Sequence, residues 1–156
     1  MDKRTASSLE AEIRAHFANW TKAVQAQDLE AIMAPYAEEV VAFDAIVALR
    51  FEGREAYRRH WEACMAYCTG PMVFELHDLK ILGEGGLAFC HALVRCGGAG
   101  PDGEVKTGWM RMTAGLRRHG DGWQVVHEHY SAPFDVETGK ALFDLEPERE
   151  PQPAVA

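Results

Sequence analysis

The sequence predicts an α+β fold, in which three N-terminal helices pack on one face of a long, curved, mixed or antiparallel sheet. Apolar residues recur at helical intervals early in the chain, at Ile13, Phe17, Trp20 and Val24. After residue 71, strand-like runs are separated by glycine-rich breaks that favour hairpin turns. Strands joined by such short turns pair antiparallel, so the order of helices first and strands afterwards indicates this fold class.

Local signals place the three helices. Ser7 and Glu10 have capping-box spacing, which predicts the start of the first helix. Asp28 is expected to cap a short second helix, which Pro35 ends because proline disrupts helical hydrogen bonding. Gly53 precedes the third helix.

The strands are predicted from runs rich in apolar and β-branched residues. Two short runs, VVAF and VALRF, flank Asp44. Four longer runs follow the third helix: MVFELHDLKIL, LAFCHALVRC, EVKTGWMRMTAGLRR and WQVVHEHYS.

Length and charge narrow the organisation of the chain. The 156 residues predict one domain, at residues 8–134, between a flexible segment at 1–7 and an acidic, proline-containing tail at 135–156. The net charge is −8, and half of it lies between residues 135 and 150, where six acids face two basic residues. An acidic chain without a basic stripe argues against nucleic acid or an anionic membrane as partner. A chain without a long apolar run or a secretory leader is expected to be cytoplasmic.

The four cysteines, Cys64, Cys68, Cys90 and Cys96, form no CxxC motif and are expected to be reduced thiols. His60, Cys64 and Cys68 are spaced along one side of a helix, but zinc needs convergent rather than stacked ligands. This spacing therefore predicts no metal site, and no cofactor is expected.

The last strand-like run raises the question of function. Side chains alternate between the two faces of a strand, so Trp123, Val125, His127, His129 and Ser131 are expected to share one face. Histidines on the side that should be core line a pocket, bind a metal, or are buried groups with satisfied hydrogen bonds.

Three stretches resemble the nuclear-transport-factor-2-like superfamily: AVQAQDLEAIMAPYAEEVVAFD, FEGREAYRRHW and RMTAGLRRHGDGWQVVHEHYSAPFD. The last is most similar to the SnoaL-like branch. The superfamily includes ketosteroid isomerase, the SnoaL-like polyketide cyclases and the association domain of calmodulin-dependent kinase II. Such folds host enzymes and assembly domains alike, so the resemblance specifies fold more closely than chemistry.

The resemblance implies a cone, in which the sheet wraps around the helices and leaves an apolar pocket at its wide end. It places the face with His127 and His129 inside this cone. It also suggests that Trp109, Arg111 and Thr113 line the cavity, although the strand alternation alone does not choose between the two faces. An inward arginine requires a carboxylate partner or an anionic ligand. The other candidates for the pocket wall are His91, Tyr57 and Trp61.

Asp44 is at the position of the catalytic base of ketosteroid isomerase according to the resemblance. A carboxylate at the edge of an apolar cavity suits a general base, because partial desolvation raises its pKa. Trp20 stands where the isomerase has a tyrosine donor, and the sheet offers no obvious carboxylic acid. The isomerase oxyanion hole is therefore not reproduced, and steroid isomerisation is not expected.

Three functions remain open. The first is a small-molecule-binding protein with proton-transfer chemistry, an isomerase, cyclase or dehydratase that acts on a carbonyl compound. Asp44 would be its base, and His127 or His129, with Trp20, its donors. The second is a non-catalytic binding or assembly module that takes a small carboxylate through Arg111 and the histidines. The third is a metal site on the two histidines, for which no third ligand has suitable spacing.

The resemblance also implies a homodimer, because related proteins cover the open sheet face with a second copy. Gln124, Val126 and Tyr130 are expected to lie near this interface.

Overall fold

The computed structural model describes residues 3–147, with side chains from residue 8 onward. Its elements are α1 (Lys3–Gln25), α2 (Leu29–Met33), β1 (Tyr36–Phe43), β2 (Phe51–Glu52), α3 (Arg54–Met65), β3 (Met72–Glu84), β4 (Leu87–Ala99), β5 (Val105–His119) and β6 (Gly122–Ser131). The six strands form one sheet in the order β2-β1-β6-β5-β4-β3. The sheet is mixed, because β1 and β6 are parallel while the other neighbours are antiparallel.

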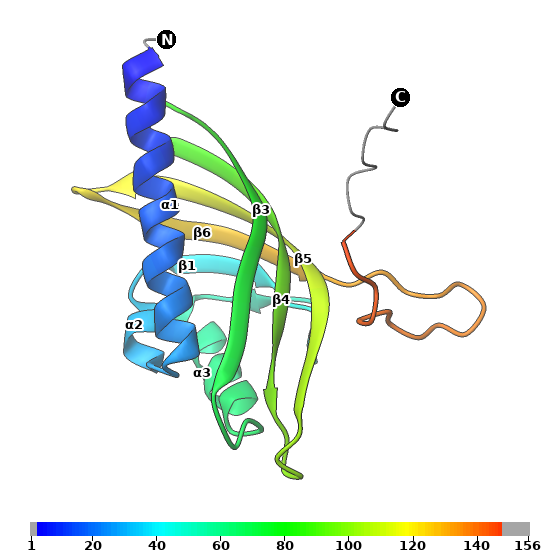
Figure 1. Cartoon of the computed structure of the whole chain (residues 1–156). Coiled ribbons are helices and arrows are strands. Elements are labelled where there is room, and N and C mark those ends of the chain that lie inside the picture. Colours follow the sequence, from blue (N-terminus) through cyan, green and yellow to red (C-terminus); the bar gives the residue numbers. More distant parts are fainter. Residues whose placement is uncertain (1–2, 148–156) are drawn as a thin grey trace, which may run out of the picture.

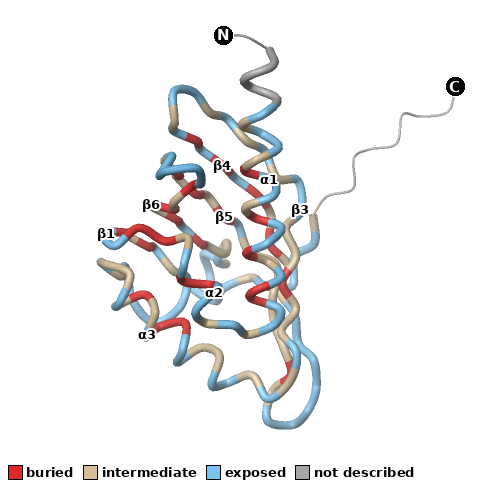
Figure 2. The backbone as a smooth tube through the Cα atoms, turned by 90° about the vertical axis from the view of Figure 1, so that its left-hand side faces the viewer, coloured by how far each residue is buried: buried red, intermediate tan, exposed pale blue. Residues whose placement is uncertain are grey.

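The predicted α+β cone is confirmed (Figure 1). The curved sheet wraps around α1, which packs on β3, while α3 packs on β1. Buried residues occur both on the helices and along the strands that surround this space (Figure 2). None of the described helices is long and apolar enough to cross a bilayer.

The predicted helix boundaries are confirmed where a local signal is strong. The Asp28 carboxylate accepts the Ala31 backbone N–H and caps α2. Gly53 precedes α3 with a φ of 86°, which glycine adopts without strain. The predicted start of the first helix at Ser7 is wrong, because α1 begins at Lys3 and includes residues expected to be flexible.

The short run VALRF does not form the predicted strand. Only Phe51 and Glu52 pair with β1, and residues 45–49 form a bent loop after Asp44.

A β-bulge in β6 interrupts the pairing with β5. Gly115 pairs with His127, whereas Leu116 pairs with Val125, so Val126 is an extra residue without a partner in β5. An extra residue reverses the alternation of side chains beyond it.

The bulge changes which residues of β6 enter the core. Trp123 is buried before the bulge, and Glu128 and Tyr130 are buried after it. His127 and His129 therefore lie on the outer face of the sheet, against Phe43, and their predicted inward orientation is wrong.

Residues 132–147 form an arm outside the sheet (Figure 1). Phe134 and Ala141 pair antiparallel in this arm, and the Trp109 backbone N–H donates to the Phe143 carbonyl at 2.9 Å. The predicted acidic tail is therefore mostly exposed but contacts the sheet through Phe143, and its residues after 147 lie outside the described ones.

We expect deletion of Val126 to abolish cooperative folding, because it removes the bulge and turns Glu128 and Tyr130 away from the core. The control Val126→Ala keeps the bulge and is expected to cost about 1 kcal/mol or less. Urea unfolding followed by circular dichroism measures both. A deletion variant as stable as the wild type would show that the bulge does not set the orientation.

Candidate active site

An apolar cavity of about 220 Å³ lies between α3 and the concave face of the sheet. Side chains from α3, four strands and the loop after β1 form its wall. The lining residues are Asp44, Ile46, His60, Trp61, Cys64, Cys68, Met72, Phe74, Cys96, Gly97, Gly98, Met110 and Tyr130. The wall is mostly apolar with a few polar groups, as is typical of small-molecule sites.

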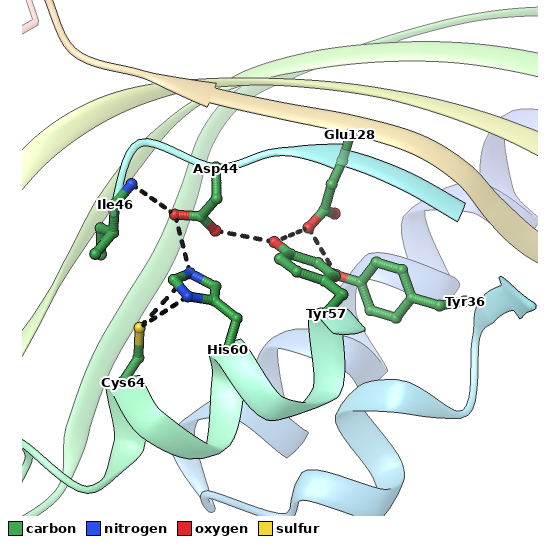
Figure 3. Close-up of polar contacts among 7 residues, drawn as sticks. All are labelled: Tyr36, Asp44, Ile46, Tyr57, His60, Cys64 and Glu128. Atoms are coloured by element: carbon green, nitrogen blue, oxygen red, sulfur yellow. Dashed lines mark hydrogen bonds and ion pairs between the residues drawn. The ribbon is translucent and has the colours of Figure 1, made fainter. Parts of the chain in front are cut away.

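Asp44 and His60 form a pair at this cavity (Figure 3). Asp44 Oδ1 is 3.3 Å from His60 Nε2 and accepts the Ile46 backbone N–H at 3.0 Å. Both side chains are largely buried, with 12% of Asp44 and 7% of His60 exposed. A buried carboxylate at one ring nitrogen fixes the imidazole tautomer and stabilises the protonated ring. The Cys64 thiol is 3.6 Å from His60 Nε2 and 3.9 Å from the remaining nitrogen, Nδ1.

A second carboxyl group, that of Glu128, is linked to this pair through the Tyr57 hydroxyl. The Tyr57 hydroxyl is 3.0 Å from Asp44 Oδ2 and 2.6 Å from Glu128 Oε1. The Tyr36 hydroxyl donates to the same Glu128 oxygen at 2.9 Å. Figure 3 shows the resulting row of side chains, which runs from Tyr36 through Glu128 and Tyr57 to Asp44.

Glu128 is buried without a cationic partner in the described part of the chain. Burial raises the pKa of its carboxyl from the ordinary 4.5 to about 7, and the Asp44 charge acts in the same direction. The hydrogen bonds from Tyr57 and Tyr36 oppose this shift of the Glu128 pKa because they stabilise the ionised form.

Two buried donors at the cavity have no partner among the described residues: the Tyr130 hydroxyl and the Trp61 indole N–H. Burial, followed by the nearby Glu128 carboxyl, holds the pKa of the Tyr130 phenol well above its usual range. Tyr130 therefore keeps its proton. Leaving a buried polar group unpaired costs about 1–3 kcal/mol.

Two of the thiols at the cavity, Cys64 and Cys96, are neutral. Burial raises the pKa of Cys64 and of Cys96 to about 11, with a further contribution from Asp44. Neither cysteine is a thiolate nucleophile at neutral pH.

Several predicted site residues lie outside the cavity. Trp109, Arg111, Thr113 and His91 are on the outer face, because the alternate residues of β4 and β5 form the buried core. Arg111 Nε donates to Ser131 Oγ at 3.2 Å, on the exposed side of the sheet. Their predicted inward orientation is wrong.

Only one of the three aromatic candidates lines the cavity. Trp61 lines the cavity as predicted. Tyr57 lies behind it, with its hydroxyl between the two carboxyl groups. Trp20 is a core residue whose indole N–H donates to the Ile32 carbonyl at 3.1 Å, so the structure does not offer it as a ligand donor.

His127 and His129 form no metal site in the described structure, in which no group of three or more metal-ligating side chains was found. His127 Nδ1 is 2.7 Å from the Val41 carbonyl oxygen, and both rings contact Phe43 edge-on.

The sequence prediction missed His60, Glu128 and Tyr130. Gly115 was the available signal for the inward orientation of Glu128 and Tyr130. It lies opposite the bulge in β6, and a glycine inside a strand often marks a bulge. His60 is one turn after Tyr57 on α3 and therefore shares its face.

The comparisons place this architecture in a known family. A family model for the SnoaL-like domain matches residues 13–135. The chain belongs to the SnoaL-like domain family. The predicted resemblance to the SnoaL-like branch of the nuclear-transport-factor-2-like superfamily is confirmed. A search of curated proteins found no match.

Solved structures agree with this assignment. A nuclear-transport-factor-2-like protein of unknown function from Pseudomonas putida KT2440 is 55% identical, with a TM-score of 0.83, over 90% of this chain and 98% of that chain. A superfamily protein from Salmonella enterica is 16% identical, with a TM-score of 0.75, over 87% of this chain and 99% of that chain. A ketosteroid isomerase-like protein from Erwinia carotovora atroseptica is 18% identical, with a TM-score of 0.65, over 78% and 93%. The last two likenesses show the fold alone.

The raised pKa of Glu128 predicts a pH-dependent stability. Between the ordinary pKa of 4.5 and the folded-state value of about 7, the folded protein keeps a proton that the unfolded chain loses. We therefore expect the free energy of unfolding to fall by ~2–3 kcal/mol as pH rises across this range. In Glu128→Gln this contribution is absent. Urea unfolding of both proteins from about pH 5 to 8 measures the difference in slope, and parallel curves would contradict the prediction.

Proposed function

We propose that this protein binds a small, largely apolar carbonyl compound and transfers a proton on it without a cofactor, as an isomerase or dehydratase does. The observation that carries the proposal is the arrangement around one cavity. A His60–Asp44 pair lies at its wall, and the same wall holds two buried donors, Tyr130 and Trp61, without partners among the described residues.

Each group has a role that fits its chemistry. His60 accepts the proton from the carbon next to the carbonyl, and Asp44 stabilises the imidazolium that forms. Tyr130 and Trp61 donate to the carbonyl oxygen, where negative charge develops. Because Tyr130 keeps its proton, it is suited to this role at neutral pH. In this scheme Asp44 acts through His60 rather than as the base itself.

The cavity volume supports a small substrate. About 220 Å³ is below the ~300 Å³ at the lower end of pockets for drug-sized ligands, which favours a compound with one or two rings over a steroid.

A small carboxylate is a poorer fit to the cavity. Arg111, the cation expected to bind it, lies on the outer face, and the lining includes the carboxyl group of Asp44. A second anion near Asp44 is repelled unless a cation offsets it.

We expect Asp44→Asn and His60→Gln each to lower kcat by about 10²–10⁴-fold, because each removes part of the proton-transfer pair. The measurement is turnover of ketones and hydroxyketones first selected by thermal shift, since a ligand of the folded state raises the Tm. His129→Gln is the matched control, because it changes a histidine on the outer face and leaves the cavity intact. Loss of turnover in the control but not in His60→Gln would contradict the proposal.

We expect Tyr130→Phe to lower kcat by about 10²-fold, because it removes one donor to the developing oxyanion. The variant keeps the ring and loses only a hydroxyl that has no partner among the described residues, so it is expected to fold normally. If a ligand selected by thermal shift still binds the variant and is turned over with unchanged kcat, Tyr130 takes no part in the reaction.

We also propose that a second copy of the chain covers the outer face of the sheet. Leu82, Leu87 and Phe89 are exposed there, and Leu82 and Phe89 are cross-strand partners. Val126 lines the same shallow hollow. Tyr130 was also predicted to lie near the interface, but it is buried in the core. Exposed apolar patches of this kind mark interaction surfaces.

Sedimentation equilibrium is expected to give twice the 17.3 kDa chain mass for the wild type. Phe89→Glu is expected to shift the protein to the monomer, because it places a charge in the apolar interface. The control Leu49→Glu changes an equally apolar, exposed residue of the loop after β1 and is expected to leave the dimer intact. A monomeric wild type would overturn this proposal.

A further inference from the structure

The Tyr57 hydroxyl lies within hydrogen-bonding distance of two carboxyl groups, although it carries only one proton. It is 2.6 Å from Glu128 Oε1 and 3.0 Å from Asp44 Oδ2, and the Tyr36 hydroxyl is 2.9 Å from the same Glu128 oxygen (Figure 3). All three contacts have the length of an O–H···O hydrogen bond.

The number of protons in this row does not match the number of contacts. Three oxygen–oxygen contacts of this length need three protons, because two oxygens without a proton between them repel. The two tyrosines supply two protons. The third therefore belongs to Asp44 or to Glu128.

The surroundings assign the third proton to Glu128. Asp44 Oδ1 accepts the Ile46 backbone N–H and is paired with His60, so its negative charge is stabilised. Glu128 appears in none of the ion pairs of the described residues. A buried carboxyl without a cation favours its neutral form.

The titratable groups that face Glu128 are few. They are Tyr36 from β1, Tyr57 from α3, Asp44 after β1 and Tyr130 from β6 itself. On β5 its cross-strand partner is Ala114, which carries no charge.

We propose that Glu128 stores a proton and that the Tyr57 hydroxyl relays it to Asp44. In the resting arrangement, Tyr36 donates to Glu128, the Glu128 O–H donates to the Tyr57 oxygen, and Tyr57 donates to Asp44. In the relay step, the Glu128 O–H bond breaks as a new O–H bond forms on Tyr57. The original Tyr57 proton moves to Asp44 Oδ2 in the same step. The negative charge thereby moves from Asp44 to Glu128, and no proton enters from solvent.

The Glu128 pKa of about 7 agrees with a proton that can leave near neutral pH. Only the use of this proton in catalysis rests on the proposed function; the proton itself and its path do not. In a reaction that needs an acid, the relay supplies one to the His60–Asp44 pair from inside the protein.

Infrared difference spectroscopy tests where the proton is. At pH 6, exposed aspartates and glutamates are ionised, and only a protonated carboxyl gives a carboxylic-acid C=O band. We expect the wild type to show this band, with a titration midpoint of about 7, and Glu128→Gln to lose it. Wild-type and Glu128→Gln spectra that coincide in this region would overturn the proposal. A band that disappears in Asp44→Asn but persists in Glu128→Gln would assign the proton to Asp44 instead, and would also overturn it.

Tyr57→Phe and Tyr36→Phe form a matched pair that tests the relay. Both remove one hydrogen bond to Glu128, but only Tyr57 also contacts Asp44. Asp44→Asn is expected to lower the Glu128 midpoint in the wild type and by a similar amount in Tyr36→Phe. The shift is expected to be at least halved in Tyr57→Phe. Equal shifts in the two tyrosine variants would eliminate the relay.

The outcomes for the two proposals are distinguishable. A carboxylic-acid band that depends on Glu128, without turnover of any carbonyl compound, would contradict the proposed function and support the stored proton. Turnover without the band would support the proposed function and contradict the stored proton.

Discussion

The contact of Glu128 with two tyrosine hydroxyls is the constraint on which the site depends. A carboxyl group in an apolar core requires hydrogen-bond partners, and here they come from β1 through Tyr36 and from α3 through Tyr57. These bonds hold α3 at a fixed distance and rotation relative to β6. His60 and Trp61 follow Tyr57 by one turn, so the same contact orients the side chains that reach the cavity.

Elements with local signals were predictable from the sequence, and the orientation of the site was not. Asp28 and Gly53 mark helix starts through their own chemistry, and the four long strands follow from composition and turns. The inward face of β6 depends instead on an extra residue, Val126, in its pairing with β5. Alternation counted from Trp123 is correct until the bulge and reversed after it, which replaces His127 and His129 with Glu128 and Tyr130.

The orientation of β5 and the structure of the arm escaped prediction for a related reason. Met110 and Met112 are as suited to a core as Trp109, so composition alone did not separate the two faces of β5. The outward Trp109 instead donates its backbone N–H to Phe143 and stacks edge-on with His77. The contact of the arm depends on the pairing of Trp109 with Phe143, which no local signal in the arm indicates.

The charge distribution in the cavity limits what it can bind. Among the described lining residues, Asp44 and His60 form the ionisable pair, while the Cys64 and Cys96 thiols and Tyr130 keep their protons. The wall therefore offers a charged pair together with two neutral donors, Tyr130 and Trp61. A ligand that satisfies both has an oxygen acceptor for the neutral donors and an acidic C–H or O–H near His60. A carbonyl compound has this polarity, and an anion does not, because it brings negative charge toward Asp44.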